Sequence, residues 1–306
     1  MDDGSSSQEG EAINKSARFS ETNNYYGIHL KEYVEINKQT QGMIIKGNNI
    51  NNPLLLFLHG GPGIPNYPTF RQTSKNLEEH FTVCYWDQRG TGMSFGKESK
   101  GFKSVEQLVE DTMELTKHLS EKYGKSKIYL LAHSWGTIIG ARAAAELPDL
   151  YHAYLGIGQL GVPAKVMGSK KGGYLQILRK IIRSRNNLLE RRYSYLQLTL
   201  DILHYPDLTA KEKFNILLGI LTSYPVLIRE VVTGNLRLLP FHFDIPVHFF
   251  IGNKDFPMTA TLGGEYIDMI QAPEKGLYFF NESAHYPFLE EADQFVRIIK
   301  EEVLYK

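Results

Sequence analysis

The serine at position 134 lies in the segment Ala132-His133-Ser134-Trp135-Gly136, which has the form small-x-Ser-x-Gly. An apolar run precedes this segment, and the small-residue-rich run GTIIGARAAAELP at 136–148 continues from it. This order predicts a strand, a sharp turn and a helix. A serine in such a turn has a strained backbone and needs small residues two positions to either side. The pattern therefore predicts that Ser134 is a nucleophile.

A nucleophilic serine needs a base, and the base needs an orienting carboxylate. When the serine follows a middle strand, the acid and the histidine are expected later, in that order, each after a further strand. Asp255 follows the apolar run VHFFIG at 247–252, and His285 follows the run GLYFF at 276–280. We therefore predict a catalytic triad of Ser134, Asp255 and His285.

Two glycine-containing loops also follow apolar runs. The loop HGGPG at 59–63 comes directly after LLLFL at 54–58. Three glycines at this place let backbone N–H groups approach a ligand closely, as an oxyanion hole requires. The second loop is DQRGTGMS at 87–94. We interpret its Asp87 and Arg89 as a structural ion pair that braces these loops.

The elements that would position these residues alternate along the chain. Short apolar runs suit strands covered on both faces, and helix-like segments separate them, which favours a mostly parallel sheet. The alternation stops between about residues 163 and 240, where the pattern is helical. We predict an α/β fold with a mostly parallel central sheet, helices on both faces and a helical cap insertion. The predicted parts are a disordered leader at 1–24, a core at 25–160 and 241–306, and a cap at 161–240.

The composition is that of an ordinary globular protein. Of the 306 residues, 42% are hydrophobic and 22% are charged, which excludes a disordered, collagen-like or coiled-coil chain. Basic and acidic residues are equal at 34 each, so nothing global attracts nucleic acid or an anionic membrane. We expect neither as a partner, and the sequence leaves the oligomeric state open.

The amino terminus opens with acids and serines and lacks the basic start and apolar core of a signal peptide. The longest apolar stretch, 214–228, is interrupted by polar residues and Pro225, so we predict a buried helix rather than a membrane span. The single cysteine, Cys84, excludes an internal disulfide, which suits a reducing compartment. We expect a cytoplasmic protein.

The predicted cap has an unequal charge balance. Between Gly161 and Pro240 there are 13 lysines and arginines against 5 acids, a net charge of +8. The simplest interpretation is a solvated helix surface. Alternatively, the cap forms a mouth that favours anionic or neutral substrates over cations.

With these motifs identified, the chain resembles the α/β-hydrolases, and within them the proline iminopeptidase (prolyl aminopeptidase) group. The resemblance is carried by HGGPG at 59–63, DQRGTGMS at 87–94, HSWG at 133–136, GNKD at 252–255 and SAHYPFLEE at 283–291. It implies a serine hydrolase in which Ser134 is the nucleophile, His285 is the general base and then acid, and Asp255 fixes the imidazole tautomer. It also implies an oxyanion hole formed by the backbone N–H groups of Gly61 and Trp135.

In the proline iminopeptidase group, acidic side chains of the cap hold the free amine of the substrate. The cap of that group also carries a tryptophan-and-glutamate signature. The cap predicted here lacks it, because both tryptophans, Trp86 and Trp135, lie in the predicted core. The cap glutamates are Glu190, Glu212 and Glu230, and we expect each of them at the surface.

The resemblance favours removal of the N-terminal residue from small peptides through an acyl-serine intermediate. Two alternatives stay open: a carboxylic ester or lactone hydrolase, and a non-catalytic binding protein that kept the scaffold. Epoxide hydrolases and dehalogenases of this fold are disfavoured, because their covalent chemistry needs an aspartate at the position of Ser134. The sequence has no metal-ligand spacing or phosphate-binding motif, so we expect no metal or cofactor and a small-molecule or small-peptide substrate.

Overall fold

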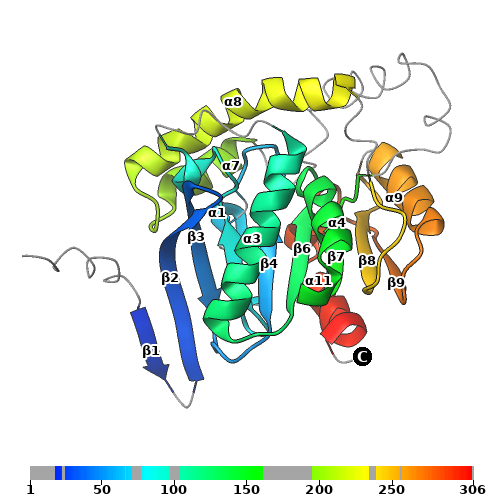
Figure 1. Ribbon diagram of the computed structural model, residues 1–306, viewed down its shortest axis with the longest axis horizontal. Coiled ribbons are helices and arrows are strands. Elements are labelled where there is room, and N and C mark those ends of the chain that lie inside the picture. Colours follow the sequence, from blue (N-terminus) through cyan, green and yellow to red (C-terminus); the bar gives the residue numbers. More distant parts are fainter. Residues whose placement is uncertain are drawn as a thin grey trace, which may run out of the picture.

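The structure is a computed structural model that describes residues 18–22, 25–65, 67–70, 77–96, 104–160, 195–233, 239–255 and 257–304. Within these residues, nine strands form one sheet in the order β1-β2-β3-β5-β4-β6-β7-β8-β9 (Figure 1). The strands are β1 Arg18–Thr22, β2 Tyr25–Ile36, β3 Gln39–Gly47, β4 Leu54–Leu58, β5 Thr82–Trp86, β6 Ile128–His133, β7 Tyr151–Ile157, β8 Val247–Gly252 and β9 Lys275–Phe280. The helices are α1 Tyr67–Phe70, α3 Val105–Tyr123, α4 Gly136–Glu146, α7 Tyr195–His204, α8 Ala210–Thr233, α9 Pro257–Met269, α10 Pro287–Glu290 and α11 Ala292–Ile299, with short turns of other helix types at Gly92–Ser94, Pro148–Leu150 and Lys300–Leu304.

The described sheet is antiparallel at its amino-terminal side and parallel elsewhere. The pairs β1–β2, β2–β3 and β3–β5 are antiparallel, whereas β5, β4, β6, β7, β8 and β9 run parallel to one another. Parallel strands bring their carboxyl ends to one edge, which is where ligands bind in open α/β sheets. The prediction of a mostly parallel central sheet is confirmed.

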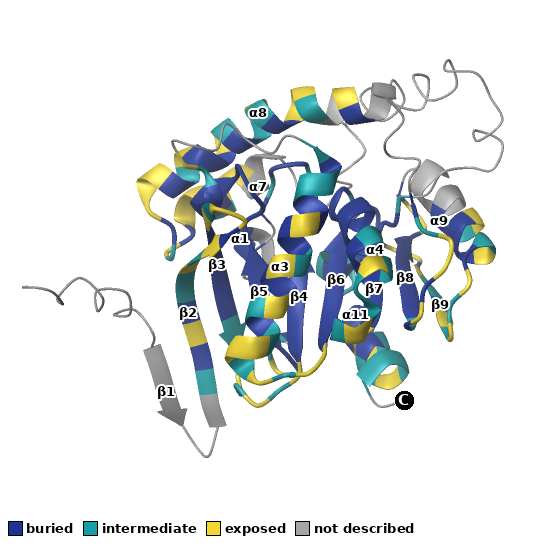
Figure 2. Cartoon of the chain, in the orientation of Figure 1, coloured by how far each residue is buried: buried dark blue, intermediate teal, exposed yellow. Residues whose placement is uncertain are grey.

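Two apolar cores cover the two faces of the sheet. Along β4, Leu54, Leu56 and Leu58 pack in the cluster that contains α3 and α4. The alternate residues Leu55 and Phe57 pack in the cluster that contains α10 and α11. Each fully buried side chain of this size contributes about 1.5–3 kcal/mol. Figure 2 shows the central strands buried along their length, and the helices α3 and α4 exposed only on their outward sides.

The strand β1 corrects the predicted leader at 1–24. Residues Arg18–Thr22 pair with β2 in antiparallel register, so the prediction of disorder was wrong for this segment. An edge strand needs only backbone hydrogen bonds to one neighbour, and polar side chains on it hide its apolar signal. Residues 1–17 lie outside the described residues.

Helices α7 and α8 form the described part of the predicted cap at 161–240. The segments 161–194 and 234–238 lie outside the described residues, so the domain boundaries stay predictions. Helix α8 crosses above the sheet at the top of Figure 1. The helix is continuous from Ala210 to Thr233.

Ion pairs attach the loop between α7 and α8, and the first turn of α8, to β2 and β3. Lys31 Nζ lies 2.6 Å from Glu212 Oε2, and Lys46 Nζ lies 3.3 Å from Asp207 Oδ2. Asp207 also pairs with His29, at 2.8 Å. Because these groups are partly exposed, the ion pairs contribute little to the free energy of unfolding. Their main effect is to fix the position of the cap helices on the sheet.

The predicted buried helix at 214–228 is buried on one face only. Ile216 is fully buried, whereas Leu217 and Leu221 are 55% and 69% exposed. A surface helix needs one apolar face, and α8 carries apolar residues on its outer face as well. The continuous apolar run therefore overstated how deeply this helix is buried.

None of the described helices is both long enough and apolar enough to cross a membrane.

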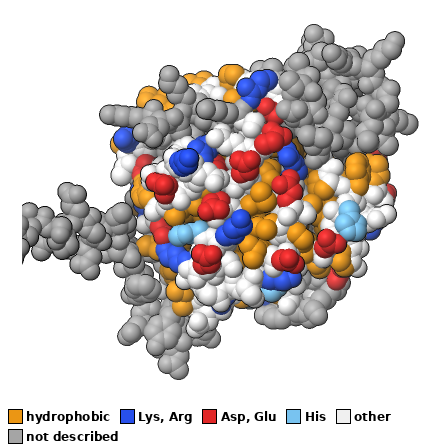
Figure 3. All heavy atoms as spheres, viewed as in Figure 1, with side chains coloured by type: hydrophobic (Ala, Val, Ile, Leu, Met, Phe, Trp, Pro, Cys, Tyr) orange, Lys and Arg blue, Asp and Glu red, His pale blue; other side chains and the backbone are white. Residues whose placement is uncertain are grey.

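Charged side chains of both signs mix on the surface. Figure 3 shows Lys and Arg interspersed with Asp and Glu over the face that Figure 1 presents. This agrees with the equal totals of 34 basic and 34 acidic residues. Interactions between exposed charges that lie farther apart than the Debye length are largely screened by salt.

The predicted ion pair between Asp87 and Arg89 is wrong. Arg89 instead binds Asp111 of α3 through two contacts, Nε to Oδ2 at 2.6 Å and Nη2 to Oδ1 at 2.7 Å. Asp87 Oδ2 accepts hydrogen bonds from the Met93 backbone N–H at 2.6 Å and the Tyr67 hydroxyl at 3.0 Å. Burial raises the pKa of Asp87 to about 8, so this carboxyl carries a proton near neutral pH. Closeness in sequence did not identify the partner of either group.

Replacing Arg89 with methionine is expected to lower the free energy of unfolding by about 3–5 kcal/mol, because Asp111 would be left buried without its cation. Asp111 is fully buried, and its remaining partners are amide groups of Asn37 and Gln41. Urea unfolding followed by circular dichroism measures the change. As a control, Lys254→Met removes an exposed ion pair with Glu282 and should cost about 1 kcal/mol or less. A similar cost for the two variants would contradict the importance of the buried pair.

Candidate active site

Ser134 occupies the turn between β6 and α4, as the sequence predicts for a nucleophile. Its φ angle is +52°, and among the described non-glycine residues only Asn37 and Lys38 also have positive φ. The Ser134 backbone N–H donates to Ile157 O at 2.9 Å, and Thr137 Oγ1 donates to Ser134 O at 2.6 Å. These contacts hold a backbone conformation that costs of order 1–3 kcal/mol, which is common at catalytic positions.

The small residues on either side of Ser134 are required by close packing. A Cβ atom added to Gly136 would lie 2.6 Å from Leu58 O and 2.8 Å from His59 O. On the other side, Ala132 is fully buried. A Cβ atom added to Gly140, one turn into α4, would lie 2.9 Å from the Cβ of Ala132. The turn therefore admits small side chains only, which is the reason that the sequence pattern is informative.

Asp255 and His285 come together as the sequence predicts. Asp255 follows β8 and His285 follows β9, and His285 Nδ1 lies 2.8 Å from Asp255 Oδ2. The two side chains are only 1% and 5% exposed. Burial lowers the pKa of His285, but the Asp255 carboxylate outweighs it, so the pKa is raised above its ordinary value. The contact fits an imidazole whose Nδ1–H is held by a carboxylate and whose Nε2 is left to accept a proton.

The end of β7 brings the serine and the histidine to the same place. Ile157 O accepts the hydrogen bond from Ser134, and the next residue, Gly158, has φ +55°. A Cβ atom on Gly158 would lie 3.0 Å from His285 Cε1 and 3.7 Å from Asp255 Oδ2. In the described structure Ser134 Oγ makes no hydrogen bond to His285. In unliganded enzymes this contact is often long and tightens when substrate binds.

His133 takes a part that the sequence did not reveal. Its Nε2 lies 2.9 Å from the carbonyl oxygen of His285, and the two rings are 4.8 Å apart. Burial lowers the pKa of His133 well below its ordinary value, so the ring is neutral. A neutral imidazole with a protonated Nε2 donates to the carbonyl and holds the backbone of the predicted base.

The HGGPG loop lies against the nucleophile turn. A Cβ atom on Gly60 would lie 3.2 Å from the Cβ of Ser134 and 2.9 Å from Nδ1 of His133. Gly61 has φ +119°, in the region that favours glycine, and Trp135 is buried at the start of α4. Trp135 therefore follows Ser134 directly in the chain, and Gly61 follows the loop residue that lies against Ser134. Their part in binding an oxyanion stays a prediction.

The cap helix α8 rests directly on this loop. A Cβ atom on Gly63 would lie 3.0 Å from the carbonyl group of Gly219, and a Cβ atom on Gly219 would lie 2.8 Å from Thr91 Oγ1. Thr91 Oγ1 donates to Gly63 O at 2.9 Å. The three residues let α8, the HGGPG loop and the DQRGTGMS loop meet backbone to backbone.

The expectation that the cap glutamates lie at the surface was wrong for two of them. Glu212 is 7% exposed and Glu230 is 1% exposed, and Glu190 lies outside the described residues. The Glu212 carboxylate accepts hydrogen bonds from Lys31, Tyr33 and Thr209. Its negative charge is therefore already paired with the Lys31 ammonium group within the protein. Both residues lie on the face of α8 turned toward the core.

Glu230 shares a face of α8 with Gly219. The two residues are eleven positions apart, which is close to three helical turns, so they project in nearly the same direction. Glu230 Oε1 lies 3.1 Å from Arg229 Nη2, and the arginine side chain is 55% exposed. Glu230 therefore places a buried carboxylate on the same side of α8 as Gly219, about three helical turns further along.

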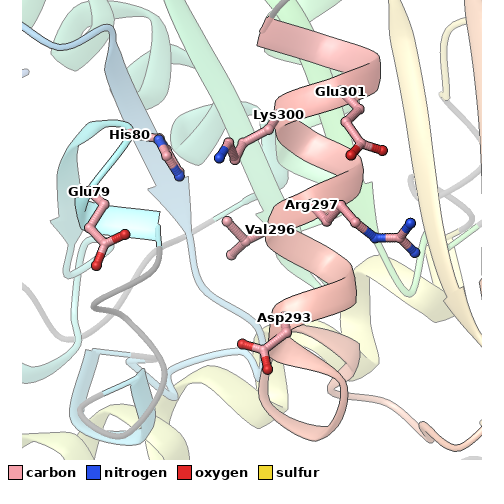
Figure 4. Close-up of a pocket in the computed structure, with 7 residues that line it drawn as sticks. All are labelled: Glu79, His80, Asp293, Val296, Arg297, Lys300 and Glu301. Atoms are coloured by element: carbon pink, nitrogen blue, oxygen red, sulfur yellow. The ribbon is translucent and has the colours of Figure 1, made fainter.

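A pocket of about 330 Å³ lies between α11 and the residues before β5 (Figure 4). It is lined by Glu79, His80, Asp293, Val296, Arg297, Lys300 and Glu301. In Figure 4, Lys300 points toward His80, whereas Arg297 points away. The pocket includes no residue of the predicted triad, and its charges are mixed. It is therefore not the site of the predicted reaction.

The described residues were also compared with the ligand sets that bind metal ions. Over the described ranges, no three His, Cys, Asp or Glu side chains are grouped as metal ligands. Cys84 is buried in β5, and burial raises the pKa of its thiol, which makes it a packing residue rather than a nucleophile.

Comparison with known proteins places this geometry in context. Residues 53–292 match the family model of the alpha/beta hydrolase fold. The chain is 30% identical to a probable aminopeptidase, YbaC, of Bacillus subtilis, over 89% of this chain and 95% of the relative. It is 25% identical to a proline iminopeptidase of Clostridioides difficile, over 86% of this chain and 94% of the relative.

A solved structure gives the same fold at lower sequence similarity. The epoxide hydrolase VrEH1 from Vigna radiata superposes with a TM-score of 0.63 and 21% identity, over 91% of this chain and 98% of that chain. At this identity the match shows the fold alone. The sequence motifs, the sheet order and the family match agree, and the chain belongs to the α/β-hydrolase fold family.

Proposed function

We propose that this protein is a serine hydrolase that removes the N-terminal residue from small peptides through an acyl-enzyme. The observation that carries the proposal is the strained Ser134 beside the buried Asp255–His285 pair. This is the nucleophile, base and orienting carboxylate that acyl transfer requires. The two relatives described above, each matched over most of this chain, are by name a probable aminopeptidase and a proline iminopeptidase, which supports the peptide substrate.

The reaction would proceed in two halves. His285 Nε2 takes the proton of the Ser134 hydroxyl, whose oxygen attacks the carbonyl carbon of the scissile bond. Backbone N–H groups of Gly61 and Trp135 would hold the oxyanion, and His285 would return its proton to the leaving amine. Water, deprotonated by His285, then attacks the acyl-serine and releases the amino acid, leaving Ser134 protonated again.

The cap supplies a group for the free amine of such a substrate. We propose that Glu230, buried on the same side of α8 as Gly219, is the carboxylate that receives it. An amine cation at this position would pair with a carboxylate shielded from water, which strengthens their attraction. The cap's sequence charge of +8 does not prevent this, because the local partner decides the interaction.

A substrate comparison tests the proposal. Proline β-naphthylamide should be hydrolysed with a kcat/KM about 100-fold above N-acetylproline β-naphthylamide, because the blocked substrate lacks the amine cation that the Glu230 carboxylate would receive. Glu230→Gln should remove most of this difference. A preference for p-nitrophenyl esters or lactones with no requirement for a free amine would replace the peptidase proposal with the ester or lactone hydrolase. A folded protein that hydrolyses none of these substrates would indicate the non-catalytic alternative.

A further inference from the structure

The loop that carries His285 is held by two adjacent glutamates. Glu290, the last residue of α10, accepts a hydrogen bond at Oε2 from the Ala284 backbone N–H at 2.7 Å. Glu291 accepts at Oε2 from Ser283 Oγ at 2.5 Å. The side chains are neighbours in sequence, but they hold different parts of the loop. Glu290 contacts the residue directly before His285, and Glu291 contacts residues farther away.

Glu290 fixes the backbone on both sides of His285. In addition to Ala284, the Tyr286 backbone forms a hydrogen bond with its carboxylate. His133 holds the carbonyl oxygen of His285 itself, at 2.9 Å. A catalytic base must be kept within about 0.5 Å of its productive position. The peptide groups that determine where the His285 ring projects are thus tied to two side chains outside the triad.

We propose that Glu290 is a positioning residue for His285, and that its carboxylate, held at the Ala284 backbone N–H, also acts on the ring as a nearby negative charge. The inference rests on the proposed function, because His285 acts as the base only in that reaction. Glu290 would act through the loop and through space, without touching the substrate. In sequence it is one of the two glutamates that close SAHYPFLEE.

The groups around His285 allow the charge effect to be separated. Asp255 faces the ring from the loop after β8, His133 faces it from β6, and Glu290 approaches from α10. His133 is neutral, because burial lowers its pKa well below the ordinary value. Burial lowers the pKa of His285, while Asp255 and then Glu290 raise it. Burial also raises the pKa of Glu290, against its backbone hydrogen bond from Ala284.

The test compares Glu290→Gln with Glu291→Gln. Glutamine keeps an oxygen that can accept from Ala284 but carries no charge. Glu290→Gln should therefore lower the pKa of His285, read from its ring proton in an NMR titration, by about 0.5–1 pH unit, less than a charge in direct contact produces. The acid limb of kcat/KM should move to lower pH by the same amount. The His285 signal is assigned by its loss in His285→Gln.

Glu291→Gln is the matched control. Glu291 holds the Glu282 backbone N–H at 3.0 Å as well as Ser283, but it is not among the charges that act on His285. It should leave both the NMR titration and the acid limb where they are in the wild type. Any general loosening of the loop would appear in this variant too.

Glu290→Ala tests the positioning role. Alanine removes both the charge and the hydrogen bond to Ala284, so kcat should fall roughly 10- to 100-fold, as a small misplacement of a catalytic group does, with KM little changed. An unchanged His285 titration in Glu290→Gln, or an equal shift in Glu291→Gln, would overturn the inference. The titration needs no turnover, so a wild type without hydrolase activity would end the proposed function while the NMR result still decides the role of Glu290.

Discussion

Replacing Ser134 with alanine is expected to lower kcat by about 10⁶-fold, the scale on which loss of a serine nucleophile acts in a triad. Alanine keeps the small size that the turn requires but removes the oxygen that attacks the substrate. The backbone would keep its contacts with Ile157 and Thr137, which do not involve the Ser134 hydroxyl. Initial rates on the preferred substrate, measured with purified protein, give the change.

A control variant separates chemistry from folding. Ser120→Ala removes a serine hydroxyl in α3 that bonds Lys125 O, away from the triad. It should keep wild-type kcat, and Ser134→Ala should have the circular dichroism spectrum of the wild type. If Ser134→Ala retained more than a small part of the activity, the acyl-serine mechanism would be wrong.

Changing Asp255 to asparagine should reduce kcat by about 10⁴-fold, as loss of the orienting carboxylate does in serine hydrolases. The amide cannot stabilise an imidazolium, and its NH₂ group can favour the wrong tautomer of His285. Asp255 is also the main group that raises the pKa of His285, so the acid limb of kcat/KM should move to lower pH. Rates measured across a pH series report both effects.

Asp244→Asn provides the matched control for the aspartate change. Asp244 pairs with His242 at 3.0 Å, and both side chains are more than 60% exposed. An exposed pair of this kind contributes about 1 kcal/mol or less, so activity should be unchanged. Near-normal turnover in Asp255→Asn would mean that another acid orients the base.

The sequence predicted the parallel part of the sheet well because its strands are buried on both faces. A run such as Leu54–Leu58 is apolar at every position, and few other structures accommodate five such residues. The turn around Ser134 was predictable for a similar reason. Contacts of Gly136 with the backbone of Leu58 and His59 exclude larger residues. The small size of the residue at this position therefore reports the close packing around the turn.

The parts that the sequence could not reveal depend on partners distant in the chain. Arg89 lies two residues from Asp87 but binds Asp111, because the loop and α3 meet only in the folded sheet. Edge strand β1 carries polar side chains, so its pairing leaves little trace in hydropathy. Glu230 reads as a surface residue by type, and only the direction of its helix face makes it buried.

The groups that hold His285 were missed for the same physical reason. His133 and Glu290 bind backbone atoms, and a backbone partner has no side-chain identity that could be matched in the sequence. Any residue at 284 would present the same N–H to Glu290. Sequence patterns therefore indicated the atoms that react and left out those that position them.

Reaction with a fluorophosphonate, followed by mass spectrometry of the proteolytic peptides, tests the central claim most directly. The reagent forms a stable bond only with a serine whose neighbour can take its proton. We predict one adduct per chain, on the peptide that contains Ser134, and its loss in His285→Gln. A folded wild-type protein that stays unlabelled, or an adduct on a different serine, would contradict the assignment of Ser134 as the nucleophile.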